Sequence, residues 1–191
     1  MPGRTYSSLL EVATDQYGYV TSEDARRLGV DPQRLVVLAD RRVIERTDRG
    51  IYRFPTVPNT PLDQLMQATL WPRGQGVLSH ATALDIHELC DVNPAKIDIT
   101  IPRAMRIRRE IPALYALHRR DLQSDEKTLH EGIPVVSVFR AILDGIEAHL
   151  RSGLIEQAID TARRHGLLRK DQLAAIRALQ RSDVDVSRVG P

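Results

Sequence analysis

The sequence of 191 residues is poor in cysteine, lysine and aromatic residues, and it lacks any long apolar run. Its single cysteine, Cys90, excludes an internal disulfide and a cysteine-rich zinc site. The aromatic share of 4% argues mildly against an aromatic-lined ligand pocket. No stretch is long enough to span a membrane, and Glu11 and Asp15 interrupt the segment in which a signal peptide needs an apolar core. We therefore expect a cytoplasmic protein without a membrane partner.

Positive charge is carried almost entirely by arginine, with 24 arginines against 3 lysines. The formal net charge of +2 is too small to indicate a nucleic-acid partner by itself. Arginine contacts guanine and phosphate through paired hydrogen bonds, but a GC-rich genome also enriches arginine over lysine. The positions of the arginines, and not their number, therefore have to decide whether nucleic acid is bound.

Residues 21–53 show the order helix, tight turn, helix and β-hairpin, which is typical of a winged helix-turn-helix. Thr21 and Asp24 have the spacing of a helix cap, and Gly29 suits the positive φ found just past a helix end. Asp31, followed by proline, starts a second helix that runs to about Arg42. The side chains expected to face the core of this module are Ala25, Leu28, Leu35, Leu38 and Ala39. Two short strands, residues 43–44 and 51–54, complete the module.

A segment rich in proline, residues 55–61, marks a domain boundary. The sequence therefore predicts an α+β protein. It consists of a winged helix-turn-helix domain over residues 1–57, a mixed α/β domain dominated by helices over 58–181, and a flexible tail over 182–191. In the second domain, strict alternation predicts a strand at 97–101. A strand at 132–136 is expected at a sheet edge, because its proline cannot donate a ladder hydrogen bond. The remaining expected elements are a strand at 114–118 and helices near 6–17, 62–70, 79–88, 137–150, 154–165 and 170–180.

Two sets of residues resemble a known family. The first comprises residues 18–20, 28–30 and 49–52, and the second comprises residues 130–137 with Arg140, Leu143 and Asp144. In this order and spacing they are similar to AbiEi-type antitoxins of bacterial abortive-infection, or type IV toxin–antitoxin, systems. The resemblance implies that the protein represses its own operon through the winged helix. It also implies that the domain over residues 58–181 is the antitoxin domain, which neutralises a nucleotidyltransferase-like toxin encoded beside it. Arg42 departs from the pattern, because such modules often have glycine there, and we expect a less sharp end to the second helix.

The second helix of the module is expected to enter the major groove of double-stranded operator DNA. Arg34 and Arg41 are nearly two turns apart and share a face, on which each can read guanine. Gln33 can read adenine, and Val37 can pack on a thymine methyl group. An ordinary solvated helix face is the alternative. The other expected DNA contacts are Thr21 and Ser22 at a helix amino terminus, which otherwise only cap it, and Arg46, Arg49 and Arg53 around the wing.

A second basic cluster follows the strand at 97–101 and the next strand; it consists of Arg103, Arg106, Arg108, Arg109, Arg119 and Arg120. These side chains can extend the DNA footprint, since each neutralised phosphate steepens the salt dependence of binding. They can equally meet an acidic surface of the toxin, or line a solvated loop.

No motif indicates a cofactor, a metal or a catalytic site. His80, His87 and Cys90 are the only candidate metal ligands close in sequence, and core or capping roles explain them better. Gly-rich phosphate loops and a nucleophile elbow are absent. We therefore expect no enzyme. Two alternatives remain open: an enzyme that covalently inactivates the toxin, and a ligand-responsive regulator unrelated to a toxin.

Overall fold

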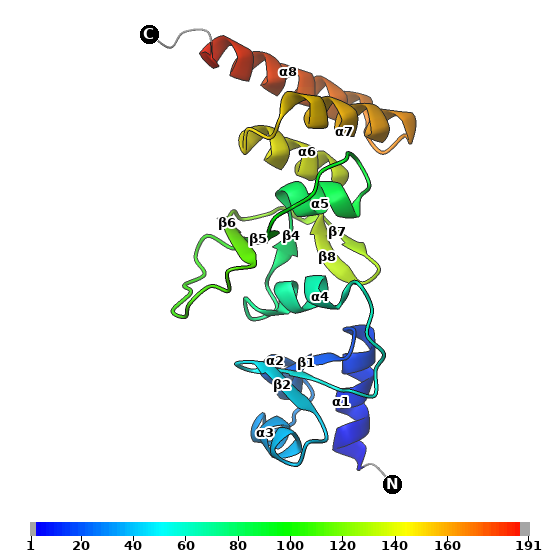
Figure 1. Ribbon diagram of the computed structural model, residues 1–191, viewed down its shortest axis with the longest axis vertical. Helices are drawn as coiled ribbons and strands as arrows, with labels where there is room; N and C mark the ends of the chain where they lie inside the picture. Colours follow the sequence, from blue (N-terminus) through cyan, green and yellow to red (C-terminus); the bar gives the residue numbers. More distant parts are fainter. Residues whose placement is uncertain (1–2, 188–191) are drawn as a thin grey trace. The chain divides into compact units, whose positions relative to one another are not determined.

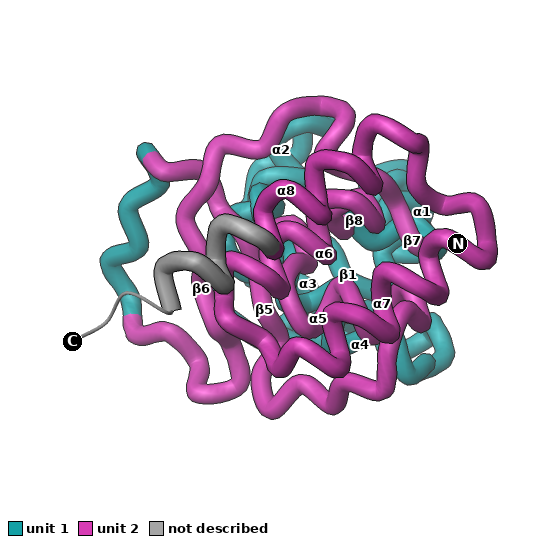
Figure 2. Tube along the Cα trace, turned by 90° about the horizontal axis from the view of Figure 1, so that it is seen from above, with its two compact units in different colours: residues 1–76, 104–109, 131–134 teal, residues 77–103, 110–130, 135–191 magenta. Residues whose placement is uncertain are grey.

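The computed structural model describes residues 3–187, which form two compact units (Figures 1 and 2). The first unit contains residues 1–76, 104–109 and 131–134, and the second contains the remainder. Helices and two sheets occur together, so the expected α+β class is confirmed. Within the described residues, no helix combines the length and the apolar character needed to cross a bilayer.

The first unit is built on four helices and a small sheet. Its elements are α1 (Arg4–Asp15), β1 (Tyr19–Thr21), α2 (Ser22–Arg27), α3 (Gln33–Asp40), β2 (Glu45–Asp48), β3 (Ile51–Arg53) and α4 (Asp63–Leu70). The sheet has the order β1-β3-β2, with both pairs antiparallel. A shared apolar core joins the helices to the sheet; it consists of Leu9, Ala13, Val20, Ala25, Leu35, Ile44, Tyr52 and Phe54.

Three details of this unit differ from the expectations. Leu28 is 40% exposed, because α2 ends at Arg27 and does not carry the next residue into the core. The strand expected at 43–44 begins instead at Glu45, since the Val43 amide donates to the Leu38 carbonyl and still belongs to the end of α3. Strand β1 was not predicted.

The first unit also continues past the expected boundary at residue 57. Asp63 of α4 forms a buried ion pair with Arg53 of β3, at 3.1 Å. The hydroxyl group of Tyr19 in β1 lies 3.3 Å from Oε1 of Gln67 in α4. These polar contacts hold α4 against the small sheet, and they could not be read from the proline-rich composition of residues 55–61.

The second unit is a five-stranded sheet with helices. Its elements are β4 (Val77–Leu78), α5 (His80–Ile86), β5 (Ile97–Ile101), β6 (Tyr115–Arg119), a 3₁₀ turn (Ser124–Glu126), β7 (Lys127–His130), β8 (Ile133–Val136), α6 (Val138–Glu147), α7 (Ser152–Arg164) and α8 (Lys170–Ser187). The strand order is β6-β5-β4-β8-β7, and the first two residues of β8, Ile133 and Pro134, are grouped with the first unit. Helix α5 packs on β5 and α6, and α7 and α8 pack on α6, on its far side from the sheet (Figure 1).

Two expectations for this unit are corrected. Strand β8 is not at an edge: it lies between β4 and β7, and it pairs with β4 through Leu78 and Val135, the residue after Pro134. Helix α8 continues to Ser187, into the segment expected to be a tail, because no glycine or proline follows Gly166 until residue 190. The last part of the expected tail, residues 188–191, lies outside the described residues.

Candidate nucleic-acid interface

Helix α3 separates an apolar side from a polar side. It begins at Gln33 with Pro32 in the cap position, one residue later than expected, and Oδ1 of Asp31 accepts a hydrogen bond of 2.9 Å from the Gln33 amide. Leu35 is completely buried, whereas Gln33 and Arg34 are exposed. Arg41, at the carboxyl-terminal cap, is also exposed. Within the described residues neither Arg34 nor Arg41 forms an ion pair, so both guanidinium groups are available to an external partner.

The end of α3 is sharper than the sequence led us to expect. Arg42 adopts a positive φ of 57°, the conformation that glycine usually supplies at this point. The Val43 amide then donates to the Leu38 carbonyl over 2.9 Å, which closes the last turn. The helix therefore terminates abruptly without a glycine, at the expense of a left-handed arginine.

Thr21 acts as the cap of α2. Its hydroxyl group accepts from the Asp24 amide, and the Asp24 carboxylate accepts from the Thr21 amide, so the expected capping box is confirmed. The Ser22 amide donates to the Gly50 carbonyl over 2.9 Å. These contacts engage Thr21 and the Ser22 amide internally, while the side chain of Ser22 stays half exposed.

The β2–β3 hairpin carries three arginines in two different environments. Arg46 and Arg49 are exposed on the hairpin, and Gly50 provides the positive φ of its turn. Arg53 is only 8% exposed and donates to the Val57 carbonyl and to Asp63. Because its guanidinium group is engaged inside the unit, we remove Arg53 from the expected DNA contacts.

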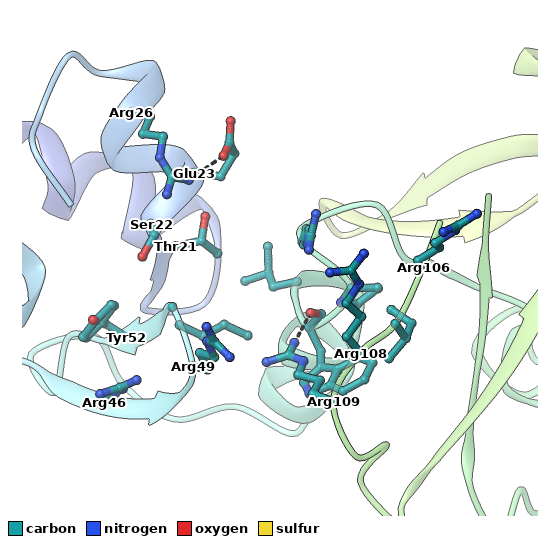
Figure 3. A pocket seen from close by; sticks show the side chains of 17 residues that line it. Thr21, Ser22, Glu23, Arg26, Arg46, Arg49, Tyr52, Arg106, Arg108 and Arg109 are labelled. Atoms are coloured by element: carbon teal, nitrogen blue, oxygen red, sulfur yellow. Dashed lines mark hydrogen bonds and ion pairs between the residues drawn. The ribbon is translucent and has the colours of Figure 1, made fainter. Parts of the chain in front are cut away.

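A hollow of about 660 Å³ lies next to the hairpin, and all of its lining residues belong to the first unit (Figure 3). It is bordered by the start of α2, the hairpin, the end of α4 and the loop 104–109. Figure 3 shows Arg49 on the hairpin facing Arg108 and Arg109 of the loop, whereas Arg106 points away from the hairpin in this view. Seven arginines line the hollow: Arg26, Arg46, Arg49, Arg73, Arg106, Arg108 and Arg109.

Arg109 fixes the loop to the rest of the first unit. Its guanidinium group stacks over the Trp71 ring at 4.0 Å and also donates to the Trp71 carbonyl. A further nitrogen lies 3.3 Å from Oδ1 of Asp48 on the hairpin. One side chain therefore links the loop, the end of α4 and the hairpin, and holds the walls of the hollow together.

The charge of the hollow is largely uncompensated. Glu23, the one acidic residue in its lining, pairs with Arg26 at 2.8 Å, and Arg109 pairs with Asp48. In the described part of the chain no ion pair involves the other lining arginines: Arg46, Arg49, Arg73, Arg106 and Arg108. Such a concentration of guanidinium groups favours a ligand that carries several negative charges.

The second basic cluster is divided between the two units. Arg106, Arg108 and Arg109 lie in the hollow of the first unit, whereas Arg103, Arg119 and Arg120 belong to the second unit. The Arg119 guanidinium donates to the Arg103 carbonyl over 3.4 Å, and Arg120 pairs with Glu147.

The hollow also contains two arginines that the sequence reasoning missed, Arg26 and Arg73. Arg26 could have been selected from the sequence, because it lies in the predicted helix that Thr21 caps. Arg73 lies in a loop with no signal in the sequence.

The second unit contains a polar cluster that the sequence reasoning also missed. Ser79 is fully buried, and its hydroxyl oxygen lies 2.8 Å from Oγ1 of Thr100 and 2.9 Å from Nδ1 of His80. Ser79 occupies the cap position of α5 but makes no capping bond. The His80 ring stacks on the His118 ring at 3.5 Å, and His118 contacts Asp98 at 2.8 Å. The described residues contain no group of His, Cys, Asp or Glu arranged to hold a metal ion.

Burial dominates the electrostatics of this cluster. It lowers the pKa of His80 to about 4, with the neighbouring His118 as the next cause. Burial also raises the pKa of Asp144, although Arg140 donates to this carboxylate over 2.8 Å. The second oxygen of Asp144 is buried without a hydrogen-bond partner among the described residues, 3.8 Å from Nδ1 of His80.

Comparison with known proteins agrees with the amino-terminal motifs. Residues 7–55 match the family described as "Transcriptional regulator, AbiEi antitoxin". Among solved structures, the crystal structure of the RV2827C protein from Mycobacterium tuberculosis is similar, with a TM-score of 0.54 and 15% identity over 92% of this chain and 72% of that chain. At this identity the likeness concerns the fold alone. A comparison with curated proteins finds no match. The match over residues 7–55 thus agrees with the family that the amino-terminal motifs resemble.

Proposed function

We propose that the protein is a DNA-binding repressor of its own operon and the antitoxin to a nucleotidyltransferase-like toxin. In this proposal residues 1–57 act as a winged helix-turn-helix, with α3 as the recognition helix and the β2–β3 hairpin as the wing. The observation that carries the proposal is the division of α3 into a buried Leu35 side and an exposed side with unpaired arginines. The match of residues 7–55 to a family of transcriptional regulators supports it.

The exposed side of α3 has the chemistry for reading bases. With about 3.6 residues per turn, Arg34 and Arg41 project from nearly the same side of the helix. A paired hydrogen bond from one arginine to guanine discriminates by about 1–3 kcal/mol per base pair. Gln33 and Val37 lie on the same side and supply an adenine contact and a methyl contact. Arg46 and Arg49 on the wing contact the phosphate backbone of the DNA.

The proposed DNA-binding role is tested with the purified full chain and DNA from upstream of its own gene. Fluorescence anisotropy would compare this DNA with a scrambled duplex of the same length and composition. We expect specific binding that is lost in Arg34→Ala and Arg41→Ala. Arg177→Ala, which removes the same charge from the exposed side of α8, should bind normally. Equal affinity of the wild type for both duplexes would contradict the proposal.

The proposed antitoxin role is tested by co-expression with the product of the adjacent gene. We expect the chain to restore growth that the toxin arrests, whether it acts on the toxin directly or indirectly. The proposal assigns DNA binding to the first unit and the antitoxin role to the second, so Arg34→Ala should lose repression and retain the growth rescue. Absence of rescue by a wild-type chain that accumulates normally would contradict the antitoxin role.

A further inference from the structure

The arginine-lined hollow of the first unit is not explained by recognition through α3 alone. Arg46, Arg49, Arg73, Arg106 and Arg108 line it without an ion pair in the described residues. Bringing so many like charges together is electrostatically unfavourable unless an anion neutralises them. Three of the seven lining arginines come from residues 104–109, which lie far from residues 7–55 in the sequence.

The hollow is held in shape before any ligand binds. Arg109 is stacked on Trp71 and paired with Asp48, so residues 104–109 are tied both to α4 and to the hairpin. The adjacent Arg108 is therefore presented from an anchored loop and not from a freely moving one. A preformed arrangement reduces the entropy lost on binding.

We propose that this hollow binds phosphate groups of the DNA backbone, so that residues 104–109 extend the DNA-binding surface beyond the winged helix. The inference rests on the proposed DNA-binding function and adds a second element to it. Arginine side chains donate paired hydrogen bonds to phosphate oxygens, and this chemistry carries no base specificity. The hollow therefore contributes affinity and orientation, while α3 reads the sequence.

The lining of the hollow favours the phosphate backbone of DNA over a free nucleotide. Nucleotide sites and single-strand sites usually offer an aromatic face on which a base stacks. The two aromatic residues of the hollow, Trp71 and Tyr52, are only 1% and 3% exposed. The guanidinium group of Arg109 also covers the Trp71 ring. No base-stacking surface is offered by the lining, so phosphate is the part of a nucleic acid that fits.

The experiment measures DNA affinity across a salt series for the wild type, Arg49→Ala, Arg108→Ala and a control, Arg177→Ala. Arg177 is exposed on α8, belongs to the second unit and does not line the hollow. Each lost phosphate contact should lower the slope of log K against log salt by about 0.9, which is roughly a 3-fold change in relative affinity between 50 and 200 mM. The loss of affinity should be equal for upstream and scrambled DNA, and Arg177→Ala should match the wild type.

An unchanged slope in Arg108→Ala, or an equal change in Arg177→Ala, would overturn the inference. If the wild type still binds upstream DNA specifically, that result leaves the proposed function intact. Inorganic pyrophosphate provides the second arm: we expect it to compete with DNA for the wild type and less well for Arg108→Ala. Saturable pyrophosphate binding that leaves DNA affinity unchanged would instead assign the hollow to a free phosphate ligand and refute the backbone proposal.

Discussion

Acidification is expected to destabilise the second unit through His80. This side chain is 16% exposed and stacked on His118, and burial lowers its pKa from 6.5 to about 4. The unfolded chain then binds the proton more tightly than the folded chain. The contribution of His80 to stability is therefore constant above pH 6.5 and is lost as the pH falls from 6.5 towards 4. The difference of about 2.5 pKa units corresponds to roughly 3 kcal/mol in full, and to about 2 kcal/mol at pH 5.

The charged groups around His80 modify this loss but do not reverse it. Asp98 and Glu147 favour the protonated ring, whereas Arg140 disfavours it. The raised pKa of Asp144 acts in the opposite direction, because protonation of this carboxyl group favours the folded state as the pH falls through that pKa. Burial also lowers the pKa of His87, which adds to the acid destabilisation. The contribution of His80 must therefore be isolated with a variant.

His80→Asn is the suitable variant, because asparagine tolerates the positive φ of 51° at this position and does not titrate. The chain has two units, so the measurement should report on the second unit by itself. Native-state hydrogen exchange of the β5 amides reports on the second unit alone. Comparing the wild type with the variant at the same pH removes the pH dependence of the intrinsic exchange rate. Between pH 7.5 and pH 5 the wild type should lose about 2 kcal/mol more than the variant. An identical loss in both proteins would refute the reasoning.

Two further predictions concern backbone and packing. Arg42→Gly should stabilise the first unit by about 1 kcal/mol, because glycine adopts the left-handed conformation without strain. Arg41→Gly should destabilise the unit, because residue 41 has an ordinary φ of −81°. Unfolding followed by Trp71 fluorescence measures both stabilities, and equal changes in the two variants would contradict the prediction. Gly145→Ala should lower the stability of the second unit by about 1–3 kcal/mol relative to the control Gly153→Ala. A Cβ at Gly145 would lie 2.8 Å from the side chain of Ile155, whereas a Cβ at Gly153 would meet nothing within 4 Å. Equal β5 exchange in these two variants would show that the packing relaxes freely.

Local signals in the sequence predicted the elements that local interactions determine. The capping box of Thr21 and Asp24, the positive φ of Gly29 and the strand at Ile97–Ile101 all appear as expected. Each depends on residues a few positions apart or on a period of two. The exposed side of α3 also follows from helical periodicity, which is why Arg34 could be selected from the sequence.

Long-range contacts account for what the sequence could not predict. Arg53 looked like a surface arginine of the wing, yet its partner Asp63 lies ten positions away, on α4. Arg109 reaches Asp48 across 61 positions, so the hollow has no local signature. The stacking of His80 on His118 depends on the pairing of β5 with β6, which strand patterns do not specify. Pairings of this kind are set by tertiary structure and not by propensity.

The most direct test of the account is the ratio of affinities for upstream and scrambled DNA, measured at one salt concentration for the wild type, Arg34→Ala and Arg108→Ala. If α3 reads bases and the hollow holds the backbone, Arg34→Ala should reduce this ratio by roughly 5- to 150-fold, the equivalent of 1–3 kcal/mol. Arg108→Ala should weaken binding to both duplexes and leave the ratio unchanged. A ratio that is unchanged in Arg34→Ala would contradict the assignment of α3 as the recognition helix.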